Sequence, residues 1–299
     1  MQLFQDQCMK PVSLPSRSSG VSLIEILISL VIGLVVVGAV LVSIVGAGKA
    51  GRYQAAFSQM NEDAQVGLSI LARDLQMAGY SQPTALTNST PLLPTPTMVL
   101  TFNPTVTRAV FGCDTGFANA AAATVVCGSV TTPALEVAYE ADTANTVATV
   151  GGLPSDCLGN GIPGVAPFVA RNRYFISAGN SGRPELYCAS NNAANTPQPL
   201  IENIENMRVW YGVSVAADPR QVVRYVSATN INAVGAAEWN NVISVRICLL
   251  VRSAEPVLNA GDEDTLTYRD CSSVTQTSND RYLRRAYFAT SSLRAKMPL

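Results

Sequence analysis

Residues 18–34 read SSGVSLIEILISLVIGL, and this stretch decides how the rest of the chain is interpreted. Small residues ending at Gly20 precede an apolar run whose only carboxylate is Glu25. From Ile26 to Gly48 the run contains neither a charged residue nor a proline. Because a helix rises about 1.5 Å per residue, this run is long enough to cross the roughly 30 Å hydrocarbon core of a bilayer.

Three interpretations of this segment compete. A secretory signal peptide needs a short apolar core before a small-residue cleavage site; residues 46–48 offer such a site, but the run is too long. An ordinary membrane anchor leaves Gly20 and Glu25 unexplained. The third interpretation is cleavage after Gly20. A carboxylate deep in a bilayer costs roughly 2.5–3.5 kcal/mol, and the new ammonium group at Val21, or that of a neighbouring subunit, would neutralise it.

The same residues resemble the class III signal of type IV pilins and pseudopilins. In that family a prepilin peptidase cuts after the glycine and methylates the new N-terminus, and the glutamate guides the subunit into the filament. The resemblance therefore assigns peptidase cleavage to Gly20 and Val21, N-methylation to Val21, and filament assembly to Glu25.

The sequence departs from the family pattern in two respects. Val21 stands where the family most often has Phe, and the leader is weakly basic, with only Lys10 and Arg17 positive. Because Lys49 and Arg52 flank the other end of the run, the positive-inside rule does not decide the orientation. The resemblance implies that the leader is cytoplasmic and that the remainder is periplasmic.

An amphipathic pattern continues the helix beyond the membrane span. Gly79 and Pro83 supply signals for its end. Glycines at 46, 48 and 51 favour either a local bend or a continuous helix that tolerates small residues. Apolar residues at spacings of three or four form one face, which we expect to pack on a domain rather than bind a partner: Tyr53, Phe57, Met60, Ala64, Leu68, Leu71, Leu75 and Ala78.

Prolines and short alternating runs replace the helical pattern after about residue 80. Alternation with a period of two predicts strands at 97–102, 134–140, 207–215 and 242–252. The stretches 118–132 and 189–199 are interpreted as loops. The predicted fold class is α+β and type IV pilin-like, a long N-terminal helix packed on a β-rich globular domain. Its expected parts are a removable leader at 1–20, a helix at 21–79 with its transmembrane part at about 21–48, and a periplasmic domain at 80–299.

Cysteine usage points to an oxidising compartment. Cys8 precedes the proposed cut, and the six that remain are candidates for disulfides: Cys113, Cys127, Cys157, Cys188, Cys248 and Cys271. Buried free thiols are the alternative, and the absence of a Cys-x-x-Cys pattern disfavours a metal. Six cysteines allow many connectivities, so pairing nearest neighbours (113 with 127, 157 with 188, 248 with 271) is a guess. Cys248 lies on the same side of its predicted strand as Arg246 and Arg252. We therefore expect its disulfide to lie outside the main core.

Composition excludes several kinds of chemistry. Histidine is absent and the net charge is −1, which removes histidine-based catalysis and disfavours nucleic acid as a partner. We find no catalytic constellation and expect no enzyme activity, cofactor or metal. The acidic stretch 259–264 is interpreted as a solvated turn rather than a calcium site. Arg281, Arg284 and Arg285 are interpreted as a solvated face rather than as ion-pairing groups.

Four further stretches resemble the PilW family of minor pilins. They read ARDLQMAGY at 72–80, ENMRVWYGV at 205–213, VISVRICLLVRS at 242–253 and RRAYFATSSLR at 284–294. Members of that family are low-abundance pilins that prime filament assembly and often carry a tip adhesin. The resemblance implies other minor pilins, the major pilin, the prepilin peptidase, the inner membrane and a tip adhesin as partners. It implies a single pass through the inner membrane and then a place in the pilus filament at the cell surface.

Two rival functions remain. A minor pseudopilin of type II secretion has the same N-terminus and architecture, and deletion separates the two, since loss of pili and twitching indicates a pilus whereas loss of exoprotein release indicates secretion. A membrane-anchored periplasmic binding domain or enzyme would keep its activity without residues 1–50.

Overall fold

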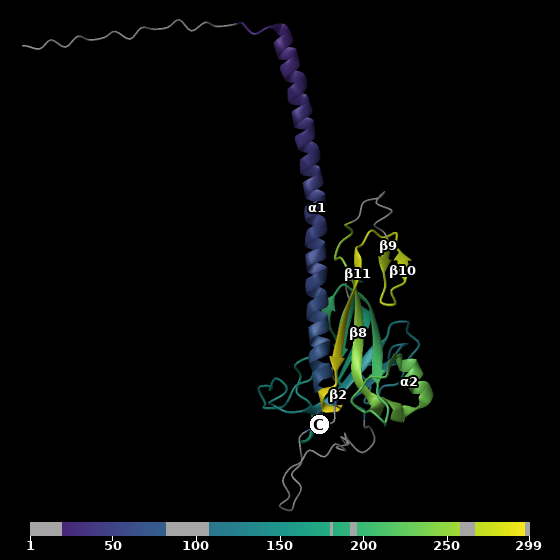
Figure 1. Cartoon of the computed structure of the whole chain (residues 1–299). Coiled ribbons are helices and arrows are strands. Elements are labelled where there is room, and N and C mark those ends of the chain that lie inside the picture. The colour runs from purple at the N-terminus through teal and green to yellow at the C-terminus, as the bar shows by residue number, and fades with distance from the viewer. Residues whose placement is uncertain (1–19, 82–107, 180–181, 192–195, 258–266, 297–299) are drawn as a thin grey trace, which may run out of the picture. The chain divides into compact units, whose positions relative to one another are not determined.

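The computed structural model describes residues 20–81, 108–179, 182–191, 196–257 and 267–296 (Figure 1). Its contacts divide the chain into two compact units, residues 1–52 and 53–299. Helix α1 spans Leu23–Met77 and is assigned without a break through the glycines at 46, 48 and 51. The predicted strand at 97–102 and the acidic stretch 259–264 lie outside the described residues, as do residues 1–19 of the leader.

The first unit consists, in its described part, of the apolar half of α1 and the three residues before it. The carbonyl of Ser22 accepts the first helical bonds, from the amides of Glu25 at 3.0 Å and Ile26 at 3.2 Å. Each described residue from Gly20 to Arg52 is exposed. An 18-residue window of α1 has a mean hydropathy of 3.0, and α1 is the one described helix long and apolar enough to cross a membrane. Such a surface requires lipid or neighbouring subunits to cover it.

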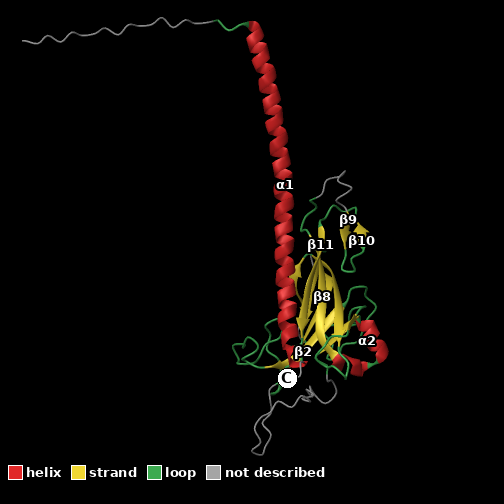
Figure 2. Cartoon of the chain, viewed as in Figure 1, coloured by secondary structure: helices red, strands yellow, loops and turns green. Residues whose placement is uncertain are grey.

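The second unit contains the strands, drawn in yellow in Figure 2. A five-stranded antiparallel meander has the order β1-β2-β3-β4-β5, and a four-stranded sheet has the order β11-β8-β6-β7. The strands of the meander are β1 (Val110–Cys113), β2 (Ala134–Ala141), β3 (Phe168–Ala178), β4 (Pro184–Ala189) and β5 (Gln198–Glu202). Those of the second sheet are β6 (Ile204–Val213), β7 (Arg224–Val226), β8 (Val242–Arg252) and β11 (Arg284–Ser292).

Smaller features accompany the two sheets, and the 3-10 helix η3 (Arg294–Lys296) ends the described chain. Strands β9 (Thr267–Arg269) and β10 (Thr275–Thr277) pair as a short hairpin. Helix α2 (Ala228–Val234) is capped by the Ser227 side chain, which accepts a bond from the Asn230 amide, and the 3-10 helix η1 (Ala236–Asn241) follows it. Together α2 and η1 bring Trp239 into the core, where its side chain is fully buried.

One hydrophobic core joins the second half of α1 to both sheets. Met60, Ala64, Leu71 and Leu75 on α1 are buried, and they pack with inward residues of the strands. Phe57 and Leu68 are partly buried. The expectation was wrong for Tyr53, which is 46% exposed, because the contacts of the helix with the core begin one turn later, at Ala56.

The predicted strands at 134–140, 207–215 and 242–252 correspond to β2, β6 and β8 with two corrections, whereas 97–102 is not tested. Strand β8 has the predicted bounds, whereas β6 begins earlier than expected and ends at Val213, so Val215 is 45% exposed. Glu136 lies on the side of the strand opposite Leu135 and Val137, yet it is also buried, with 2% exposed. The reason is an ion pair with Arg173 at 2.8 Å, over which the backbone of residues 120–123 closes by accepting bonds from that guanidinium.

Candidate functional site

The N-terminal segment brings Gly20, Val21 and Glu25 within one turn of the start of α1. Gly20 and Val21 precede the helix and are exposed. A Cβ added at Gly20 would meet no described atom within 4 Å, and its φ is not in the left-handed region. Folding of the described chain therefore does not require glycine at this position. Any need for glycine here must come from a protein that binds the segment.

Glu25 lies in the first turn of α1, where the helix dipole favours a negative charge. Its backbone carbonyl accepts a bond from the Ser29 hydroxyl at 2.7 Å. Its carboxylate forms no ion pair with any residue that the structure describes. The side chain is thus a charged group at the edge of an apolar surface, without a partner in the described chain, and it can bind a cation from elsewhere.

Three disulfides reinforce the second unit. They join Cys113 to Cys127, Cys157 to Cys188 and Cys248 to Cys271, so the pairing follows chain order. The last bond belongs to a small hydrophobic cluster with Leu250 that is separate from the main core, as the strand parity predicts. Cross-links of this kind stabilise a domain mainly by restricting its unfolded chain.

A buried polar cluster fixes the second half of α1 to the meander. The Asp74 carboxylate accepts bonds from the Tyr174 hydroxyl and from the Asn172 amide, each at 2.6 Å. The same amide donates to the Tyr139 hydroxyl at 3.2 Å. Burial raises the pKa of Asp74, and these donors oppose the rise. Burial and the Asp74 charge raise the pKa of both tyrosines, so both hydroxyls stay protonated, and that of Tyr174 donates to Asp74.

Two further contacts hold α1 near β11. The Tyr287 hydroxyl donates to Asn61 at 2.7 Å, and the Arg285 guanidinium lies 4.9 Å from the centre of the Phe57 ring. At Gly67 an added Cβ would lie 3.0 Å from a Leu249 methyl group, so the helix and β8 approach closely there. The helix face is therefore fixed at several points along the domain.

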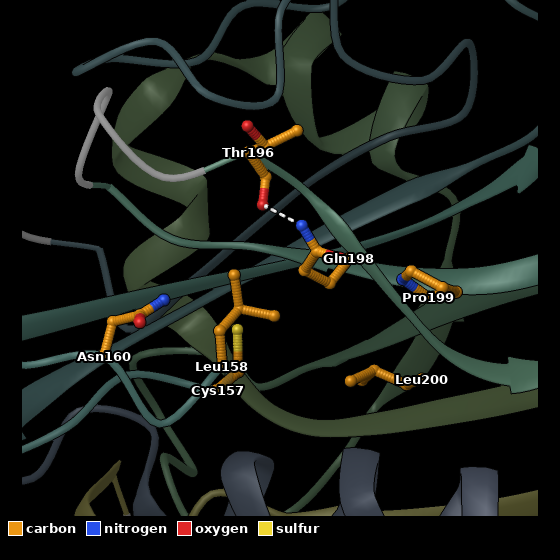
Figure 3. Close-up of a pocket in the computed structure, with 7 residues that line it drawn as sticks. All are labelled: Cys157, Leu158, Asn160, Thr196, Gln198, Pro199 and Leu200. Atoms are coloured by element: carbon orange, nitrogen blue, oxygen red, sulfur yellow. Dashed lines mark hydrogen bonds between the residues drawn. The ribbon is translucent and has the colours of Figure 1, made fainter.

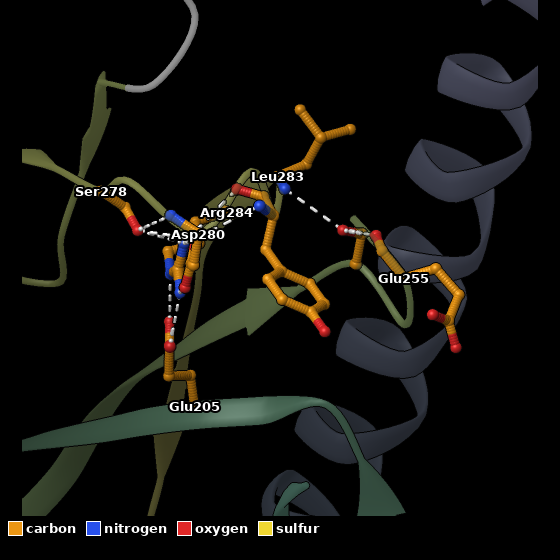
Figure 4. Close-up of polar contacts among 8 residues, drawn as sticks. Glu205, Glu255, Ser278, Asp280, Leu283 and Arg284 are labelled. Atoms are coloured by element: carbon orange, nitrogen blue, oxygen red, sulfur yellow. Dashed lines mark hydrogen bonds and ion pairs between the residues drawn. The ribbon is translucent and has the colours of Figure 1, made fainter. Parts of the chain in front are cut away.

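The Arg284 side chain is not solvated, contrary to the sequence expectation. Its guanidinium is 4% exposed and pairs with both Glu205, at 2.5 Å, and Asp280 (Figure 4). Bonds chiefly from Arg284 hold the pKa of Asp280 well below its usual range. The cluster ties the segment before β11 to β6, which is a structural role and not a binding site.

The pocket shown in Figure 3 has a volume of about 540 Å³ and lies beside the Cys157–Cys188 disulfide. Its lining is Cys157, Leu158, Asn160, Thr196, Gln198, Pro199 and Leu200. One hydrogen bond joins lining residues, from the Gln198 amide to the Thr196 carbonyl at 3.2 Å. None of its described lining residues is acidic or basic.

Sequence reasoning missed Asp74 and the paired state of Arg284. For Asp74 a signal exists, since it stands three residues after Leu71 and directly before Leu75, within the apolar face of α1. For Arg284 the signal is weak: Asp280 is only four residues away, but Glu205 is 79 residues away and is brought close only by the fold.

Two protein-family models match this chain, one in the globular domain and one at the N-terminus. The family model described as type IV pilus-assembly protein W matches residues 173–295, and that of the prokaryotic N-terminal methylation motif matches residues 15–41. Among solved structures, a type IV-like pilin from Thermus thermophilus is 14% identical with a TM-score of 0.35, over 79% of this chain and 98% of that chain. None of the curated proteins matches the sequence.

Proposed function

Because the chain belongs to the PilW family of type IV pilus-assembly proteins, we propose that it is a minor pilin that primes or assembles type IV pili together with other minor pilins. The observation that carries this proposal is the conjunction of Gly20 and Glu25 with the apolar first half of α1, which is exposed on every side. In this proposal the protein lies near the pilus tip and supports an adhesin. Its role is structural, without catalysis.

Processing comes first. The prepilin peptidase removes the cytoplasmic leader at 1–20 and methylates Val21. An exposed segment outside the helix suits this step, since a peptidase needs access to the backbone around the bond that it cuts. A Cβ added at Gly20 would meet no described atom within 4 Å, which supports recognition of this glycine by the enzyme rather than a need of the fold.

Membrane storage and filament entry follow. The helix, with its transmembrane part at about 21–48, holds the processed subunit in the inner membrane, with the domain at 80–299 in the periplasm. Three disulfides suit that oxidising compartment. In the filament, the apolar surface of α1 packs on other pilins, and Glu25 pairs with the N-terminal ammonium of a neighbour. The partners are other minor pilins and the major pilin.

The test substitutes Glu25 in the full chain. Glu25→Ala is expected to leave cleavage intact and to lower the amount of the protein in sheared pili about tenfold, the effect of losing roughly 1.4 kcal/mol of pairing energy. Ser29→Ala, one turn along the same helix, is the matched control and should enter pili normally. Normal incorporation of Glu25→Ala would contradict the role proposed for this carboxylate.

Deletion tests the system in which the protein acts. Loss of surface pili and of twitching is expected. Unchanged pili with loss of exoprotein release would instead assign the protein to type II secretion.

A further inference from the structure

The four edge strands of the two sheets are β1, β5, β7 and β11, and they differ in how well they are protected. β1 has 4 residues and β7 has 3, which is too short to template another chain. β5 has 5 residues, includes Pro199 and pairs with β4 through a bulge. β11 has 9 residues, contains no proline or glycine, and keeps an unbroken register with β8. β11 is therefore the longest and most regular of these four edges, and the β9–β10 hairpin contacts it without pairing with it.

The hydrogen bonds at the two ends of β11 identify which of its backbone groups are not paired with β8. Leu283 accepts from the Ser253 amide, and the Leu293 amide donates to Ile243, so odd-numbered residues face β8. Antiparallel pairing alternates, and the N–H and C=O groups of even-numbered residues consequently point away from the sheet. Among the described residues none binds the backbone of these even positions: Arg284, Ala286, Phe288, Thr290 and Ser292.

Two arginines without an ion pair in the described residues lie near this edge. Arg246 and Arg285 are exposed, and neither forms an ion pair within the described residues. Arg246 lies on the outer face with its guanidinium 5.2 Å from the centre of the Phe288 ring and 5.8 Å from that of Trp210. A hollow of about 300 Å³ lies along the strand, lined by Arg269, Asp270, Ser273, Arg284, Arg285, Ala286 and Phe288.

We propose that the free edge of β11 receives an extended, carboxylate-bearing strand from another subunit of the pilus. Main-chain bonds to the even-numbered positions supply the pairing, and the carboxylates of the incoming strand meet Arg246 and Arg285. A second copy of β11 does not fit this edge, since residues 281–296 carry five basic residues and no acidic one. This inference rests on the proposed function and specifies the surface through which the domain meets its partner.

The experiment uses the full chain in piliated cells. A photo-crosslinking phenylalanine analogue replaces Phe288, and crosslinked peptides from sheared pili are identified by mass spectrometry. The same analogue at Tyr225 is the control, because Tyr225 lies on the short edge strand β7 and both side chains are 42% exposed. The expected product joins position 288 to an acidic segment of another pilus subunit, and position 225 yields none.

A pair of substitutions at Thr290 separates strand pairing from mere proximity. Thr290→Pro removes an outward N–H, which an edge strand tolerates, and Thr290→Val keeps that group and the strand propensity. Thr290→Pro should lower the crosslink yield from position 288 about tenfold, and Thr290→Val should leave it within about twofold. Normal leader cleavage and normal disulfides in both variants verify that they fold.

The outcomes distinguish this inference from the proposed function. If the chain is present in pili but position 288 crosslinks to nothing, to a second copy or to nucleic acid, only the edge proposal is overturned. A crosslink that survives Thr290→Pro overturns it as well. If the processed, unsubstituted chain is absent from pili, the proposed function is overturned and the edge proposal with it.

Discussion

Glu25 and Asp74 are both carboxylates on α1, and their surroundings assign them different tasks. Asp74 accepts two hydrogen bonds from the meander, so its bonding capacity is used inside the domain. Glu25 forms no ion pair with a described residue and lies on an exposed apolar surface. A charge in that setting is costly without a partner, and the filament-assembly proposal supplies one in the N-terminal ammonium of a neighbouring subunit.

The Asp74 cluster leads to a stability prediction. Tyr174→Phe removes the hydroxyl that donates to Asp74 and leaves a buried carboxylate with one donor fewer. Loss of a hydrogen bond to a buried charged group should lower the free energy of unfolding by about 1–3 kcal/mol, measured by denaturant unfolding of the full chain in detergent. Tyr282→Phe is the control, because the Tyr282 ring lies against Arg252 and its hydroxyl has no hydrogen bond in the described structure. Equal stability of the two variants would contradict an anchoring role for Asp74.

Asp280 leads to a prediction about acid. Its pKa in the folded protein lies below the ordinary value of 3.8, chiefly because Arg284 bonds its ionised form. Ionised Asp280 therefore stabilises the fold at pH values above 3.8, and this contribution is lost as the pH falls below that value. Because the side chain is 41% exposed, solvent screening reduces the effect to about 1 kcal/mol.

The measurement compares thermal unfolding at pH 6 and at about pH 2.5. Asp280→Asn should be less stable than the unsubstituted chain at pH 6 and should lose less stability on acidification. Asp218→Asn, in an exposed turn, is the control and should follow the unsubstituted chain. Equal acid sensitivity of Asp280→Asn and the unsubstituted chain would show that the Arg284 pair contributes nothing.

The two halves of α1 differ in how closely other parts of the chain pack against them, and two glycines show the difference. At Gly67 an added Cβ would lie 3.0 Å from Leu249 and 3.8 Å from Ile201. At Gly51 it would meet no atom within 4 Å. The second half of the helix is therefore shaped to the domain, whereas the first half has no such constraint within the described chain.

Gly67→Val tests that close approach. Valine is a better helix former than glycine, so a loss of stability must come from overpacking against β8. We expect the free energy of unfolding to fall by about 1–3 kcal/mol, measured by denaturant titration. Gly51→Val makes the same chemical change on the exposed part of the helix and should not destabilise the domain. Should Gly67→Val be as stable as Gly51→Val, the described packing of α1 on β8 would be wrong.

The strands show what periodicity reveals and what it does not. The alternation in 242–252 predicts β8 with its observed bounds, since one face of the strand is apolar over its whole length. The pairing of β6 with β8, which passes over β7, could not be predicted, because periodicity identifies a buried face but not the neighbouring strand. Burial of Glu136 could not be predicted for a related reason. Alternation does not show that a charged side chain is enclosed with an ion-pair partner.

For the whole molecule, the low charge content has two separate sources. The chain is 48% hydrophobic and 14% charged, and part of this reflects an apolar surface on α1 that is exposed in a single subunit. The remainder reflects a disulfide-reinforced domain with a large core. The candidate site at Gly20 and Glu25 is local in sequence and was predictable from it, whereas the β11 edge depends on sheet order and was not.

The central claim is that the chain is a processed pilin, and the intact mass of the protein tests it most directly. The full chain is co-expressed with either an active or an inactivated prepilin peptidase, and the mass of the membrane-bound product is measured. We expect loss of residues 1–20 only with the active enzyme, together with one added methyl group on Val21. A chain that stays uncut, or one that is cut after the apolar run, would contradict the account.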